Sequence, residues 1–106
     1  MTDTELYNLL KTLDLPVAYD HFEQKTNAKV EPPFIVYRED EPFTKKAEDV
    51  TWQKSNNYIV ELATDIKDVE LEENLEQLFT NNDLPYDKEE TYIDDERIFQ
   101  IRYYIS

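Results

Sequence analysis

The second half of the chain changes its hydrophobic period twice, and this constrains the fold more than any other feature. Residues 57–64 are rich in β-forming side chains, with apolar residues spaced two apart. Residues 68–81 switch to helical spacing, and residues 86–106 return to a period of two. A strand that lies on a core buries every second residue, and a helix buries every third or fourth. This order therefore predicts a helix packed on a sheet.

The first half predicts one more helix and shorter strands. Thr2 and Glu5 have the spacing of a capping box. Leucines follow at helical spacing up to Leu13, which indicates an apolar stripe along one side of a helix, and Pro16 ends the helix. Strands are expected over residues 17–22, 34–38 and 50–64, the last with a bend near 55–56. Exposed loops are expected near residues 23–32 and 39–49.

The second helix and the final hairpin have clear boundaries. Asp68 is the expected N-cap, and Asn81 or Asn82 is expected to close the helix in a left-handed conformation. Residues 94–97 are expected to form a short acidic turn between strands 86–93 and 98–105. The buried helical stripe is predicted to consist of Leu71, Leu75, Leu78 and Phe79. The last strand is predicted to turn Phe99, Ile101, Tyr103 and Ile105 inward and Gln100 and Arg102 outward.

These elements predict a single α+β domain with the order α-β-β-β-α-β-β. We expect a mixed, mostly antiparallel sheet with the two helices packed on one face. The 106 residues suffice for one hydrophobic core. The chain has no glycine, so its turns depend on Pro, Asn and Asp. Glycine-rich phosphate loops and dinucleotide-binding motifs are excluded for the same reason.

The charge balance limits the partners. There are 25 acidic and 11 basic residues, a formal net charge of −14. Such a surface disfavours binding to nucleic-acid phosphates and to anionic membranes. The absence of cysteine excludes disulfides and suits the cytoplasm or the interior of a virion. The polar start does not resemble a signal peptide, and no apolar run reaches the ~20 residues that span a bilayer. We expect a soluble protein that does not bind membranes.

No group of residues predicts catalysis. His21 is the only histidine, and Asp20 beside it is expected to point to the opposite face of a strand. No nucleophile accompanies them. The acids of residues 65–73 are explained by the positive end of a helix, and they lack the pattern of a calcium loop. We therefore expect no enzyme activity, no metal site and no cofactor.

Aromatic residues are the better candidates for function. Tyrosine and tryptophan are enriched at protein interfaces, where one end of the side chain is buried and the other forms hydrogen bonds. The alternative is a sheet core edged with tyrosines. Phe43 and Trp52 lie in or beside an acidic stretch with few apolar neighbours. The candidate interface residues are Phe43, Trp52, Tyr92 and Tyr104.

Several segments resemble the structural proteins of tailed phages and prophages. They are Leu6-x-x-Leu9-Leu10, residues 15–22 (LPVAYDHF), residues 32–37 (PPFIVY), residues 59–65 (IVELATD), residues 70–76 (ELEENLE) and residues 86–93 (YDKEETYI). Together with the closing strand they cover nearly the whole chain. The chain is most similar to the tail-terminator or tail-completion group of long-tailed phages with Gram-positive hosts.

The resemblance implies an assembly role. Proteins of this group form a ring, often a hexamer, that caps the tail tube and joins the tail to the head. The implied partners are further copies of the chain, the tail-tube protein and head-completion proteins, in the virion and, during assembly, in the host cytoplasm. DNA would pass through such a ring without being bound, because acidic groups repel phosphates. Some of the candidate channel acids are predicted to face this channel; they are Glu89, Glu90, Asp94, Asp95 and Glu96.

Two other non-enzymatic roles remain open. A minor capsid or head-tail adaptor subunit would have the same fold without ring closure. An acidic DNA mimic would use the net charge of −14 to fill a basic groove on a nuclease or restriction enzyme. The mimic predicts acids spaced like phosphates along one face and stoichiometric binding to such an enzyme.

Overall fold

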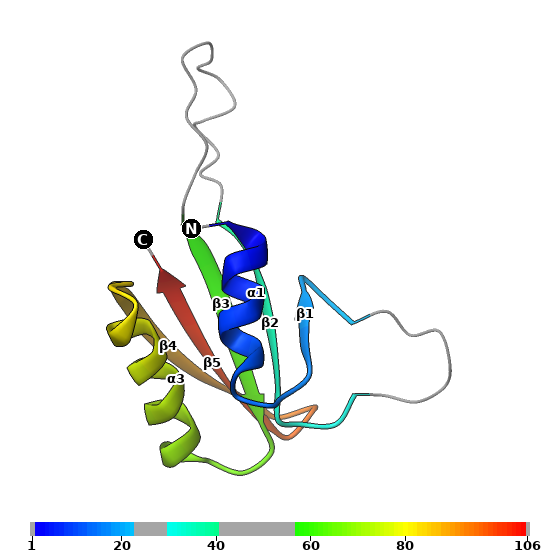
Figure 1. The fold of residues 1–106 in the computed structure, drawn as a ribbon. Coiled ribbons are helices and arrows are strands. Elements are labelled where there is room, and N and C mark those ends of the chain that lie inside the picture. Colours follow the sequence, from blue (N-terminus) through cyan, green and yellow to red (C-terminus); the bar gives the residue numbers. More distant parts are fainter. Residues whose placement is uncertain (1, 23–29, 41–56, 106) are drawn as a thin grey trace, which may run out of the picture.

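Helix α1, Asp3–Lys11, begins at the predicted capping box (Figure 1). The computed structural model describes residues 2–22, 30–40 and 57–105. The Glu5 backbone N–H donates to the Thr2 hydroxyl, and the Thr2 backbone N–H donates to the Glu5 carboxylate. Leu6 and Leu10 are fully buried. The predicted cap is therefore confirmed, and so is the inward position of the stripe, but the helix ends at Lys11 and not at Pro16.

The described residues form one five-stranded sheet with the order β1-β2-β3-β5-β4. β1 is parallel to β2, and the remaining neighbours are antiparallel, as predicted. The first strand ends earlier than expected. The segments 23–29 and 41–56, which hold most of the two predicted loops and the start of the predicted third strand, lie outside the described residues. The strands are β1 (Val17–Tyr19), β2 (Phe34–Glu39), β3 (Tyr58–Thr64), β4 (Tyr86–Ile93) and β5 (Ile98–Ile105).

Helix α3, Val69–Asn81, lies on the same face of the sheet as α1 (Figure 1). The Asp68 carboxylate caps it by accepting a hydrogen bond from the Leu71 backbone N–H, as predicted. Leu75 and Phe79 are fully buried between α3 and the sheet. Both helices share one hydrophobic core with the alternate residues of the central strands. The predicted single α+β domain with two helices on one face is confirmed.

The other side of the sheet, which we call the open face, carries no helix among the described residues (Figure 1). Successive strand residues point to opposite faces, and the register sets the outward residues of neighbouring strands side by side. The predicted orientation of the last strand is confirmed. The open face consists of Phe34, Val36 and Arg38 from β2, Ile59, Glu61 and Ala63 from β3, Ile98, Gln100, Arg102 and Tyr104 from β5, and Asp87, Glu89, Thr91 and Ile93 from β4.

Left-handed backbone falls on other residues than the sequence suggests. Asn82 has a φ of −110°, so the prediction that Asn81 or Asn82 takes the left-handed conformation is wrong. Asp83 takes it instead, with a φ of 56°. The Leu84 backbone N–H beyond it donates to the Phe79 carbonyl, so the chain turns one residue later. The other non-glycine residues with positive φ in the described ranges are Asp14, Asp20 and Arg97.

Arg97 is the position where a glycine should help most. It ends the turn between β4 and β5 with a φ of 55°, and its backbone N–H donates to the Asp94 carbonyl at 3.2 Å. A left-handed conformation costs a residue with a Cβ atom about 1 kcal/mol. We expect Arg97→Gly to raise the free energy of unfolding in urea by about 1 kcal/mol. Arg97→Ala is the control, because it removes the same charge and keeps the Cβ. A glycine variant no more stable than the alanine variant would contradict the prediction.

Candidate functional site

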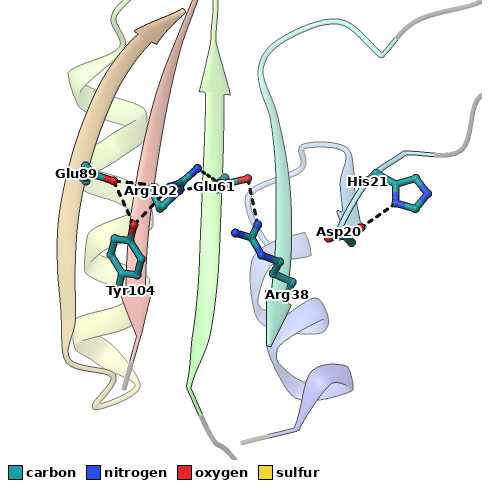
Figure 2. Close-up of polar contacts among 7 residues, drawn as sticks. All are labelled: Asp20, His21, Arg38, Glu61, Glu89, Arg102 and Tyr104. Carbon is teal, nitrogen blue, oxygen red and sulfur yellow. Dashed lines mark hydrogen bonds and ion pairs between the residues drawn. The ribbon is translucent and has the colours of Figure 1, made fainter. Parts of the chain in front are cut away.

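A row of charged side chains crosses the open face from β2 to β4 (Figure 2). Its centre is Glu61, which is only 8% exposed. Arg102 holds one oxygen of this carboxylate through Nε and Nη2, each 2.7 Å from Oε2. Arg38 reaches the other oxygen, with Nη1 3.6 Å from Oε1. The buried carboxylate is thus paired with an arginine on each neighbouring strand.

Arg102 also connects the row to Glu89 on β4, through its remaining guanidinium nitrogen. Its Nη1 lies 3.8 Å from Glu89 Oε1. The Tyr104 hydroxyl bridges the same two groups, donating to Glu89 at 3.1 Å and accepting from Arg102 at 3.5 Å. The hydrogen bond with Tyr104 and the pairing with Glu61 outweigh burial and raise the pKa of Arg102. We call Arg38, Glu61, Arg102 and Glu89 the charged row.

A groove of about 890 Å³ lies at the end of the open face nearest the turn between β4 and β5. Three separate stretches of chain meet there. They are the residues after β1, the residues before β2 together with the start of that strand, and the turn with the first residue of β5. Its described lining divides into an apolar floor of Phe22, Val30, Pro32, Phe34, Val36 and Ile98 and a polar rim of Asp20, His21, Glu31, Asp95 and Glu96.

The histidine of this rim contradicts one step of the sequence argument. His21 Nδ1 lies 3.1 Å from Asp20 Oδ2, although the two were expected to point to opposite faces (Figure 2). The strand ends at Tyr19, and Asp20 adopts a left-handed backbone with a φ of 67°, which turns both side chains to one side. The two side chains are 70% and 55% exposed.

Two of the four predicted interface residues, Tyr92 and Tyr104, lie among the described residues, and they point to opposite faces of the sheet. Tyr104 lies on the open face, whereas Tyr92 of β4 points to the helix-bearing face and packs on Phe99 with ring centroids 4.8 Å apart. Tyr92 remains 47% exposed. Phe43 and Trp52 lie outside the described residues. Their proposed role as contacts stays a prediction.

The predicted channel acids are also divided. Glu89 belongs to the charged row, but Glu90 points to the opposite face, where its Oε1 lies 2.7 Å from Lys67 Nζ. Strand alternation separates any two such neighbours. Asp94, Asp95 and Glu96 are exposed in the turn. The five acids thus do not form one surface, and the position of any of them at a channel stays a prediction.

A second charged cluster fastens α3 to the sheet, and the sequence argument missed it. Glu72 is 2% exposed, with its oxygens 2.7 Å from Lys67 Nζ and 3.0 Å from Lys88 Nζ. Glu76 accepts a hydrogen bond from the Tyr103 hydroxyl and pairs with Lys88, both at 2.7 Å. The sequence could have predicted this cluster, because Glu72 lies three residues before Leu75 and Glu76 lies three residues before Phe79. This spacing places all four side chains on the buried side of the helix.

The lysines control the ionisation of this cluster. Burial alone would raise the pKa of Glu72, but the ion pairs with Lys67 and Lys88 outweigh burial and lower that pKa. Burial alone would lower the pKa of Lys88, but its bonds to Glu76 and Glu72 raise it to about 12. Burial, assisted by the bond to Glu76, raises the pKa of Tyr103. The charges stay in place at neutral pH, so the cluster acts as a fixed structural connection.

Within residues 2–22, 30–40 and 57–105, no three His, Cys, Asp or Glu side chains come together in a way that could hold a metal ion. No helix in the same part of the chain has the length and apolar character needed to cross a bilayer.

Comparison with protein-family models, with curated proteins and with solved structures found no match to this chain. Its function is therefore argued from its own surfaces. The two surface features with a defined shape and charge are the charged row and the groove beside it. Both lie on the open face.

Proposed function

We propose that the chain is a structural subunit that works by binding other protein chains, in the manner of the tail-terminator or tail-completion proteins of long-tailed phages. In this role several copies form a ring at the head-proximal end of the tail tube and join the tail to the head. The observation that carries the proposal is the open face, a sheet surface that no helix of the described residues covers.

The composition of the open face supports contact with a protein. Phe34, Val36 and Ile98 are only half-buried on this face, so part of their apolar area remains accessible to a partner. Interfaces combine apolar area with fixed polar groups, and arginine is enriched in them. The charged row supplies arginines already held by their neighbours, so little side-chain freedom remains to be lost on binding.

The same surface favours an assembly role over DNA mimicry. A mimic presents acids in an unbroken series along one face. On the open face Arg38 and Arg102 alternate with Glu61 and Glu89, so the charged row carries no net charge. The excess negative charge lies elsewhere, including the exposed turn of residues 94–96. An excess of acids outside the charged row suits a subunit that DNA passes without binding.

Light scattering after size-exclusion chromatography tests the proposal. We expect the purified chain, alone or mixed with the tail-tube protein encoded beside it, to form a closed assembly. A hexamer would have six times the subunit mass of 12.8 kDa. A discrete complex that does not close into a ring would favour the adaptor or minor capsid role. A chain that stays monomeric with the tail-tube protein and inhibits a nuclease stoichiometrically would overturn the proposal in favour of the DNA mimic.

A further inference from the structure

We propose that the groove at the end of the open face binds a short segment of a basic partner protein, in which an apolar side chain is flanked by lysine or arginine. The inference rests on the proposed function, because it names the kind of protein segment that one surface of the subunit recognises. It is carried by the apolar floor and the acidic rim that meet in this groove.

The floor is built to receive an apolar side chain. Phe22 and Phe34 meet edge to face, with ring centroids 5.5 Å apart and planes at 80°. Val36 and Ile98 come from two different strands and continue the floor, and all four side chains are only half-buried. Apolar area left accessible in a concave site gains free energy when a partner covers it. A volume of about 890 Å³ accommodates several side chains of an extended peptide.

The rim determines the charge of the segment. Its carboxylates belong to Asp20, Glu31, Asp95 and Glu96, and no lysine or arginine stands among the described lining residues. Acidic groups come from both sides of the apolar floor, because Asp20 follows β1 whereas Asp95 and Glu96 lie in the turn before β5. A lysine or arginine on either side of a central apolar residue would therefore meet a carboxylate.

Charge complementarity selects this occupant over the alternatives. Acidic peptides and nucleic acids would be repelled by the rim and by the net charge of −14. A second copy of the chain carries the same excess of acids, so its exposed surface matches the rim poorly. A purely apolar segment would leave the carboxylates without partners. A basic segment with one apolar anchor satisfies both parts of the groove.

The inference can be tested by titrating the full chain with a short capped peptide and recording the amide chemical shifts of the chain at each step. The probe has leucine between two lysines. We expect it to bind at low salt and to shift the amides around Phe34, Ile98 and the turn. Replacing its leucine by serine should weaken binding at least about ten-fold, because the apolar contact is lost. Replacing both lysines by glutamates should abolish binding, and raising the salt should weaken it.

Paired variants locate the contact. Asp95→Asn with Glu96→Gln removes two rim charges and should weaken binding roughly two- to thirty-fold. Glu70→Gln with Glu73→Gln is the matched control, because it makes the same change in net charge on exposed residues of α3 and should alter binding less than about two-fold. Equal effects of the two pairs, shifts that fall elsewhere, or no binding at all would overturn the inference.

The outcome separates this inference from the proposed function. Ring or tail-tube assembly without peptide binding would overturn the groove assignment and leave the structural role standing. Peptide binding at the groove by a chain that forms no assembly would overturn the phage role and leave the groove assignment standing.

Discussion

Replacing Lys67 and Lys88 together by methionine should lower the free energy of unfolding by about 3–5 kcal/mol. Both lysines contact Glu72, whose side chain is 3% exposed. The double variant leaves that carboxylate buried without a cation, and an unpaired buried charge is among the most destabilising changes in a protein. Urea unfolding followed by circular dichroism measures the effect.

A triple variant provides the control for this prediction. Changing Glu72 to methionine as well removes the stranded charge, and a buried ion pair replaced by apolar side chains usually costs little. We expect the triple variant to regain most of the stability that the double variant loses. A double variant as stable as the wild type, or a triple variant no better than the double, would show that the cluster does not fasten α3 as described.

The same cluster predicts the direction of the pH dependence. The pKa of Glu72 is lower in the folded chain than its ordinary value of 4.5. Such a group stabilises the fold fully above the unfolded pKa and loses this contribution as the pH falls through the folded pKa. In the double variant, burial without a cation raises that pKa instead. We therefore expect the stability difference between wild type and double variant to be largest at neutral pH. It should begin to shrink as the pH falls through the raised pKa of Glu72 in the variant, above 4.5, and should be lost once the pH is below the lowered pKa of the wild type, in unfolding curves recorded across this range.

The local parts of the fold were predictable because local sequence determines them. The capping box at Thr2, the cap at Asp68 and the alternation of the last strand each depend on residues a few positions apart. The turn at the end of α3 was predicted at the wrong residue. Asparagine and aspartate both tolerate left-handed backbone, and the spacing did not distinguish Asn82 from Asp83.

The pairing of Asp20 with His21 shows where an alternation rule fails. The rule holds only inside a strand, and β1 ends one residue before Asp20. The groove was beyond the sequence argument for a different reason. Its walls come from residues near 20, 34 and 95, and only the strand order shows that these stretches meet. The alternation of side chains along β3 implied that Glu61 points outward. Its partner Arg102 lies 41 residues away in the chain, so the sequence alone did not show that the two side chains meet.

Replacing Arg102 by methionine should lower the free energy of unfolding by about 3 kcal/mol. Glu61 is 8% exposed, and Arg102 makes both of its 2.7 Å contacts. The variant leaves Glu61 with Arg38 at 3.6 Å as its remaining cation in the charged row. A methionine side chain conserves most of the volume, so the loss should come mainly from the charge. The measurement is the urea midpoint together with the slope of the transition.

Two further variants of the charged row identify the cause of that loss. Arg102→Lys keeps the charge but cannot make the paired contacts of a guanidinium, so its stability should fall between those of the wild type and the methionine variant. Glu89→Gln changes a side chain that is 57% exposed and should cost less than about 1 kcal/mol. If Glu89→Gln were as damaging as Arg102→Met, the stabilising contact of Arg102 would be the one on β4, and Glu61 would not be the centre of the charged row.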